Sequence, residues 1–277
     1  MSDETQVQKS LLALMCSSCG GGIIGEPNQI QSICPFCGSE QTESKPLQDQ
    51  IEFPKICYPF VLHEEDADTF YRKFAKSKFW APKEITSASL EIQKLYLPAW
   101  IWKGRIESHY AGLVSAMTHS GKRPISGTDS VYMDQNLVPA SQALRSNELN
   151  AIRPFEGTSV EFIPTTNEVP FEIAQLTRDF AKSKAQDIMQ QRHINAIHAS
   201  HSIFDLQMSS IYHDMEGEPF FLPIYIAVYR YKDTPYRVLI NGINGNLVGT
   251  SPISWLKVLV ALFSMILLLL LIIGICS

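Results

Sequence analysis

Four cysteines near the N-terminus constrain this chain more than any other feature. They form two similar turns, Cys16-Ser-Ser-Cys19-Gly20 and Cys34-Pro-Phe-Cys37-Gly38, with fourteen residues between the pairs. Each turn presents two sulfurs from one tight loop, and four thiolates at this spacing are the soft, tetrahedral ligand set of a closed zinc site. We therefore predict one structural Zn²⁺ bound by Cys16, Cys19, Cys34 and Cys37, in a zinc ribbon over residues 1–47.

Two other uses of these cysteines fit the sequence less well. A pair of disulfides needs an oxidising compartment, and a redox Cys-x-x-Cys motif occurs as a single pair within a βαβ unit. A site with four protein ligands also has no open position for a reacting water. The predicted metal is therefore structural and has no catalytic role.

An apolar run near the C-terminus, Val258–Cys276, contains no charged residue. As a helix it is about 28 Å long, close to the ~30 Å thickness of the hydrocarbon layer. Trp255 and Lys257 precede it, as is typical of a headgroup region, and no Lys or Arg follows it. We predict a single-pass transmembrane anchor over residues 253–277 in the inner membrane, with the N-terminal bulk in the cytoplasm. A buried core helix is the alternative.

The region between these two features, residues 48–252, alternates helical and strand-like patterns. Amphipathic periodicity predicts helices over Glu64–Trp80 and Phe171–Ala199. Alternating apolar residues predict half-buried antiparallel strands over Ile106–Met117 and Ser130–Val138. The predicted fold class is α+β, with a small N-terminal zinc ribbon and a single C-terminal transmembrane helix.

A weak internal repeat links the two predicted helices. Phe74-Ala-Lys-Ser-Lys78 recurs as Phe180-Ala-Lys-Ser-Lys184, and a Leu-Pro strand follows each, at Leu97-Pro98 and at Leu222-Pro223. The common order favours a duplicated helix-plus-antiparallel-strand domain over coincidence. Asn244-Gly245, between two short apolar runs, predicts a hairpin turn and no phosphate loop.

Several motifs occur in one order along most of the chain. They are the ribbon, Leu97-Pro98-Ala99-Trp100, the segment Leu222–Gly249 and Ser251-Pro-Ile-Ser-Trp-Leu-Lys257. Together they resemble a family of bacterial TFIIB-type zinc-ribbon membrane proteins, often labelled after the primosomal replication helicase. Some relatives are encoded beside phage-shock protein A and flotillin-like (SPFH) membrane-stress systems, so the resemblance implies an adaptor role. The chain has no Walker lysine loop and no helicase motif.

Charge argues against a nucleic-acid partner. The net charge is −5, and no Lys or Arg lies between Lys9 and Lys45, where Glu26, Glu40 and Glu43 do. Four thiolates on one Zn²⁺ add further negative charge, so phosphates find no cation on the ribbon. The apolar residues between the two cysteine turns, Ile23, Ile24 and Ile30, suit either a protein-contact surface or packing against the next domain. Both interpretations remain open at this point.

No set of residues in the sequence requires catalysis. His193, His198 and His201 cluster without an accompanying carboxylate motif, and they are interpreted as polar-face histidines or, alternatively, as a second metal site. Cys57 is expected to be a core cysteine and Cys276 an inert lipid-facing one. We therefore expect no enzyme and infer no small-molecule substrate.

The sequence favours a membrane-anchored cytoplasmic adaptor that contacts the bilayer and protein partners. The family resemblance implies that these partners are membrane-associated proteins of a stress response. One alternative is a membrane-tethered nucleic-acid factor with a basic face built from dispersed lysines, namely Lys73, Lys76, Lys78, Lys182 and Lys184. Another is a ligand-binding or enzymatic domain in a groove between the two halves.

Overall fold

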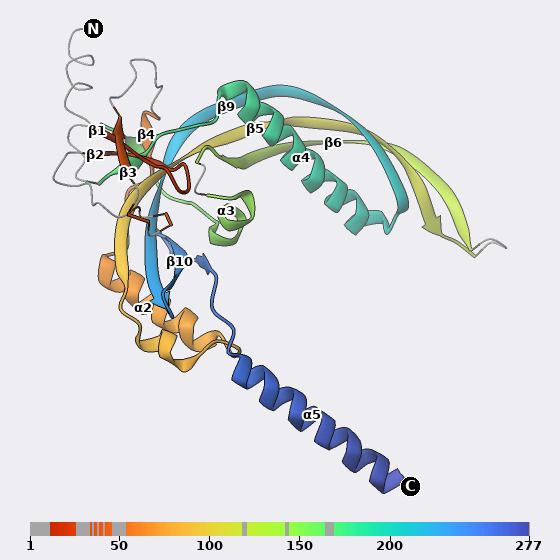
Figure 1. The fold of residues 1–277 in the computed structure, drawn as a ribbon. Coiled ribbons are helices and arrows are strands. Elements are labelled where there is room, and N and C mark those ends of the chain that lie inside the picture. The colour runs from red at the N-terminus through yellow and green to blue at the C-terminus, as the bar shows by residue number, and fades with distance from the viewer. Residues whose placement is uncertain are drawn as a thin grey trace, which may run out of the picture.

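The computed structural model describes residues 12–25, 34, 36–37, 39–40, 42–45, 54–117, 121–141, 144–163 and 169–276. Over these residues the chain forms one eleven-stranded sheet and four α-helices (Figure 1). Most strand pairs are antiparallel, but β5–β8 and β4–β9 are parallel, so the fold is mixed α/β.

Four strands form the centre of the sheet, in the order β6-β5-β9-β10, with every pair antiparallel. Their bounds are β5 (Glu91–Ser115), β6 (Lys122–Pro139), β9 (Phe204–Tyr231) and β10 (Thr234–Asn241). In Figure 1, β5, β6 and β9 curve together into a long arm. The register of β5 against β6 shifts between Trp102 and Gly104, and such irregularities increase the bend of a strand.

The ribbon strands continue this sheet and do not form a separate unit. β2 pairs with β8, and β8 pairs with β5 at Tyr96 and Phe171, so the order runs β9-β5-β8-β2-β1-β3. The short strands are β1 (Leu12–Cys16), β2 (Gly22–Gly25), β3 (Thr42–Lys45), β4 (Ile56–Cys57), β7 (Val160–Glu161), β8 (Phe171–Glu172) and β11 (Leu247–Gly249).

Two helices cover the two ends of the central strands. α2 (Glu64–Ser77) buries Tyr71 and Phe74 against the end of β9 and β10, and α4 (Arg178–His201) lies along the arm (Figure 1). The buried residues of α4 recur every four positions, as the helix period requires, and they are Ala181, Ala185, Met189, His193 and Ile197. The shorter elements are α3 (Ser146–Ile152) and the 3₁₀-helix η2 (Lys83–Ser87).

Both predicted helices exist, with changed limits. The first ends at Ser77 and not at Trp80. The second begins only at Arg178, because Phe171–Glu172 pair as strand β8 and cannot also form helical hydrogen bonds.

The C-terminal helix α5 (Trp255–Cys276) corrects a sequence-based prediction. Within the described residues, none of the helices combines the length and the apolarity that crossing a bilayer requires. This finding overturns the predicted transmembrane anchor over residues 253–277 and the single-pass inner-membrane location.

The predicted fold class is also wrong in its assembly. It placed a separate zinc ribbon before a duplicated α+β domain and a membrane span. The ribbon strands instead belong to the single large sheet. β2 pairs with β8, and this pairing satisfies backbone N–H and C=O groups that would be unpaired at the edge of an isolated ribbon.

Candidate metal centre

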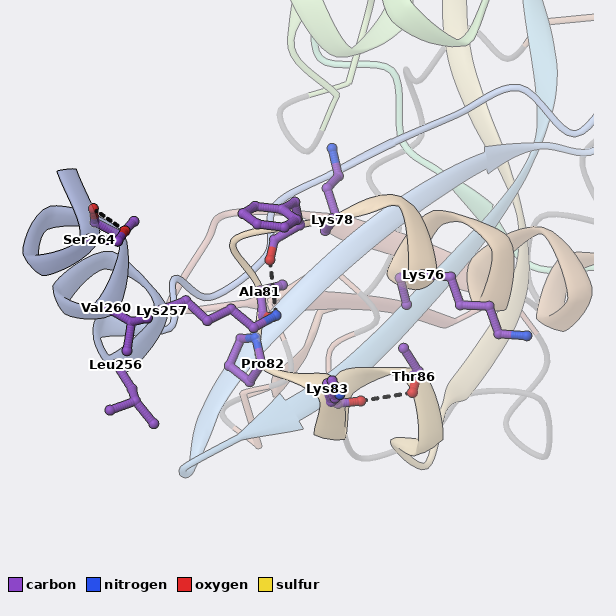
Figure 2. A pocket seen from close by; sticks show the side chains of 13 residues that line it. Lys76, Lys78, Ala81, Pro82, Lys83, Thr86, Leu256, Lys257, Val260 and Ser264 are labelled. Carbon is purple, nitrogen blue, oxygen red and sulfur yellow. Dashed lines mark hydrogen bonds between the residues drawn. The ribbon is translucent and has the colours of Figure 1, made fainter. Parts of the chain in front are cut away.

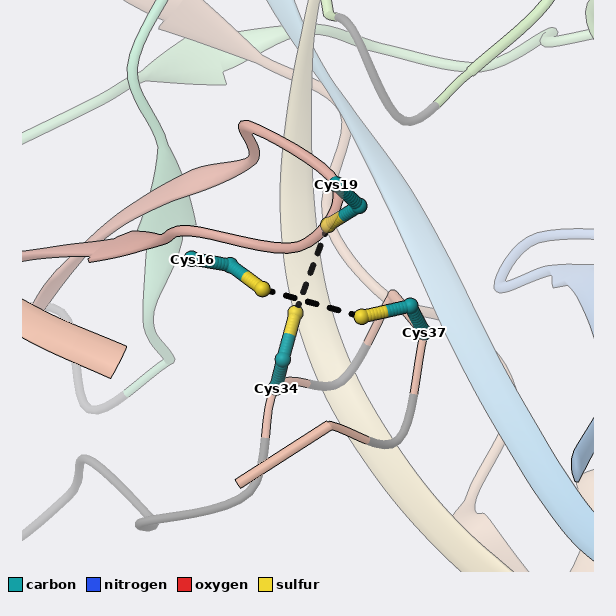
Figure 3. A group of neighbouring side chains, drawn as sticks. All are labelled: Cys16, Cys19, Cys34 and Cys37. Atoms are coloured by element: carbon teal, nitrogen blue, oxygen red, sulfur yellow. Dashed lines mark hydrogen bonds between the residues drawn. The ribbon is translucent and has the colours of Figure 1, made fainter. Parts of the chain in front are cut away.

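The four predicted ligands lie together. Cys16 ends β1 and Cys19 closes the turn after it, while Cys34 and Cys37 face them from the second turn (Figure 3). All four Sγ atoms lie within 4.8 Å of one another. The Sγ atoms of Cys16 and Cys37 are 3.6 Å apart, as are those of Cys19 and Cys34. These residues can hold a metal ion.

The spacing of the sulfurs fits a metal tetrahedron and no disulfide. A regular tetrahedron with Zn–S bonds of about 2.3 Å places its sulfurs about 3.8 Å apart. A disulfide requires an S–S distance of about 2.05 Å. The 3.6 Å separations are close to the first value and far from the second.

Backbone hydrogen bonds shape both cysteine turns. The Cys16 amide donates to the Gly21 carbonyl at 2.9 Å, and the Gly20 amide donates to the Cys16 carbonyl at 2.9 Å. Gly20 has φ of +74°, a left-handed conformation that glycine adopts without strain. In the second turn the Cys34 amide donates to the Ser39 carbonyl at 2.8 Å. The glycine that follows the first turn is therefore required by its geometry.

The thiols of this cluster have strongly divergent proton affinities. Burial raises the pKa of Cys16, but amide donors from Cys19 and Ser18 outweigh it and lower that pKa to about 7. Burial raises the pKa of Cys19 to about 11 and raises that of Cys34 further. Four thiolates this close together repel one another, and a bound dication offsets that repulsion.

The centre is packed against the body of the protein. Cys16, Cys34 and Phe36 are buried in the same hydrophobic cluster as Leu95 and Leu222 of the central strands. The residues that can hold a metal here therefore pack in the main core.

The isoleucines between the two turns are used for packing. Ile24 is completely buried beside Tyr96, Phe171 and Phe221, and Ile23 lies in the main cluster. For these two residues the structure decides in favour of packing against the domain over a free contact surface. Ile30 lies outside the described residues.

The three clustered histidines do not form a second metal site with described residues. In the part of the chain that the structure describes, the four cysteines are the only group of three or more His, Cys, Asp or Glu side chains placed to hold an ion. His198 is exposed on α4, and His201 stacks on Tyr110 with ring centroids 6.1 Å apart.

His193 has a different role, which sequence reasoning missed. It is completely buried, and its Nδ1 lies 2.9 Å from Ser108 Oγ on β5. Its Nε2 lies 2.9 Å from Asp129 Oδ2 on β6, and Ser108 Oγ lies 2.8 Å from Ser210 Oγ on β9. One polar residue within the apolar stripe of α4, between Met189 and Ile197, is the sequence signal that points to such a buried network.

This Ser–His–Asp connectivity matches that of hydrolase triads, but its burial does not. Ser108 and His193 are both 0% exposed, whereas the Asp129 side chain is 54% exposed. A nucleophilic hydroxyl must reach a substrate carbonyl, and here the accessible member is the carboxylate. The network ties α4 to three strands.

Two further candidates lie apart from the centre. Cys57 is buried, as expected of a core cysteine, and burial raises the pKa of its thiol. Lys73 and Lys76 belong to α2 and Lys78 follows it, whereas Lys182 and Lys184 belong to α4 on the arm (Figure 1). The five lysines of the predicted basic face therefore lie on two separate helices.

Comparison with protein-family models, with curated proteins and with solved structures finds no match for this chain. The resemblance to zinc-ribbon proteins therefore remains a prediction from the motifs.

Proposed function

We propose that this protein is a zinc-stabilised adaptor, without catalytic activity, that contacts protein partners through the face of its curved arm that lies away from α4. The main support is the fusion of the four-cysteine centre with the large sheet. Because the cysteine cluster shares its packing with the central strands, a structural metal rigidifies the platform from which the arm extends.

Zinc is the ion that the ligand chemistry favours. Four thiolates in a closed tetrahedral set suit Zn²⁺, whereas oxygen-rich sites suit Mg²⁺ and Ca²⁺. Purification without added metal, followed by elemental analysis, should give about one zinc per chain. The Cys34→Ser variant should lose it, and Cys57→Ser, at a buried cysteine outside the cluster, should retain it. Iron in place of zinc would contradict the assignment.

The arm offers a surface of mixed character on the side away from α4. Charged cross-strand pairs lie along it, including Lys103–Glu216 at 2.9 Å and Arg105–Asp214 at 3.3 Å. Tyr132 stands directly opposite Arg105 across the β5–β6 pair and is 59% exposed. Tyrosine and arginine are both enriched at protein contact surfaces.

A site-directed photo-crosslinker tests this proposal. In the full chain, a photoreactive phenylalanine replaces Tyr132 in one variant and Glu84, an exposed residue of η2, in the matched control. Irradiation in cells of the source should give one discrete protein adduct from position 132 and not from position 84. Equal adducts from both positions, or none from position 132, would contradict a partner on the arm.

A further inference from the structure

A groove lies where α5 leaves the body of the protein. Its volume is about 830 Å³, within the range of small-molecule sites. The end of α2, the loop after it and η2 form one wall, and the first turns of α5 form the other (Figure 2). Neither the metal centre nor the arm contributes to it.

Hydrogen bonds hold the two walls together. The Ser254 amide donates to the Trp80 carbonyl at 2.8 Å. The Lys257 ammonium donates to the carbonyls of Phe79 and Ala81 at 2.9 and 2.6 Å. The groove is therefore an ordered junction between α5 and the loop after α2.

The rim of the groove is basic. Lys76, Lys78 and Lys83 line it and are exposed, and Lys257 of α5 lines it as well. None of the described residues that line it carries a carboxylate. The Lys257 ammonium is bonded to two backbone carbonyls, and that of Lys78 lies 4.6 Å from the centre of the Phe74 ring. A ligand with an anionic group complements this charge.

The inner surface of the groove is apolar. Leu256 and Val260 of α5 are 72% and 61% exposed, and Phe79 on the facing loop is 74% exposed. Leaving such side chains in water is unfavourable by about 25 cal/mol per Å² of apolar surface, which a hydrocarbon chain in the groove recovers.

We propose that this groove binds an anionic amphiphile, namely a single alkyl or acyl chain that carries a phosphate or carboxylate group. The chain packs along Leu256, Val260 and Ala261, and the anionic group lies at the lysine rim. Charge and apolar surface are both needed, so neither a free anion nor a neutral amphiphile reproduces the interaction.

Three probes separate these contributions on the purified full chain. They are dodecyl phosphate below its critical micelle concentration, dodecyl maltoside below its own, and inorganic phosphate, each titrated by isothermal calorimetry. Dodecyl phosphate should bind one per chain, at least about 10-fold more tightly than either other probe. Equal binding of dodecyl maltoside would show an unselective apolar surface, and equal binding of inorganic phosphate would show a simple anion site. Either result, or no binding of dodecyl phosphate, overturns the proposal.

Matched variants locate the binding. The double variant Lys76→Ala/Lys83→Ala should weaken dodecyl phosphate binding at least about 5-fold, because each removes a cation from the rim. Lys182→Ala/Lys184→Ala removes two lysines from α4, away from the groove, and should leave the affinity unchanged. All four lysines are exposed, so folding should be retained, and an unchanged melting midpoint checks this. Equal affinity in both double variants would overturn the site.

Discussion

The replacement His193→Ala tests whether the buried Ser–His–Asp network holds α4 on the arm. The variant loses the hydrogen bond to Ser108 and the one to Asp129, each worth about 1 kcal/mol once the half-exposed carboxylate is discounted for solvent. It also removes a completely buried ring, which costs about 1–2 kcal/mol. We expect the free energy of unfolding to fall by about 3 kcal/mol.

Thermal unfolding followed by circular dichroism measures this loss. For a chain of this size about 3 kcal/mol corresponds to a fall of about 6–12 °C in the melting midpoint. His198→Ala, at an exposed position of the same helix, is the matched control and should change stability by less than about 0.5 kcal/mol. If His193→Ala costs no more than its control, the network does not anchor α4 and the reasoning fails.

The same network predicts a pH dependence. The hydrogen bond from His193 lowers the pKa of Asp129 below its ordinary value of 3.8. A depressed folded-state pKa stabilises the protein above the unfolded pKa, and that contribution is lost as the pH falls below about 3.8. The stability difference between wild type and Asp129→Asn should therefore be present at pH 6 and should shrink as the pH falls below about 3.8. A difference that grows as the pH falls would contradict the assignment.

Three further predictions concern other parts of the fold. Tyr71→Phe removes the buried hydrogen bond to the Ile85 carbonyl at 2.8 Å and should cost about 1–1.5 kcal/mol in urea unfolding, whereas Tyr132→Phe, at an exposed position, should cost almost nothing. Gly217→Ala places a Cβ against the buried indole of Trp102 and should cost about 1–3 kcal/mol by the same measurement; an unchanged midpoint would show that the indole moves freely. Removing the metal with a chelator under reducing conditions should lower the melting midpoint by at least about 10 °C, because the cysteine cluster packs in the main core. Adding Zn²⁺ afterwards should restore the midpoint.

The metal centre could be predicted from sequence because its information is local. Two residues separate the cysteines within each turn, so the turn alone brings two sulfurs together. The pattern could not reveal that the ribbon joins the main sheet. That junction depends on the pairing of β2 with β8, which lies about 150 residues further along the chain. β8 has only two residues, so it is too short to show the alternation of a strand in the sequence.

Long-range contacts also explain what was missed elsewhere. Apolarity near the C-terminus predicted a helix, and α5 is one, but its first turn contacts a loop 176 residues earlier through Lys257 and Ala81. His193 was grouped with its sequence neighbours His198 and His201. Its actual partners, Ser108 and Asp129, come from other strands, and no spacing along α4 points to them.

The arrangement of the central strands agrees with the predicted duplication. Leu97 pairs directly with Leu222, so the two Leu-Pro motifs meet at one point of the β5–β9 pair. The strands are arranged alike on the two sides of this point. On one side β5 pairs with β6, the strand that follows it in the chain, and on the other side β9 pairs with β10, the strand that follows it. Each half has the order helix, long strand, neighbouring strand, as α2-β5-β6 and α4-β9-β10.

The repeated pentapeptide itself does not occupy equivalent places in the two halves. Phe74 lies in the last turn of α2 and is 8% exposed, whereas Phe180 lies in the first turn of α4 and is 63% exposed. A shared ancestor predicts matching positions in the fold, and the Leu-Pro strands meet that condition while the pentapeptide does not. The duplication stays a prediction: the pairing of the two Leu-Pro strands agrees with it, and the positions of the pentapeptide do not.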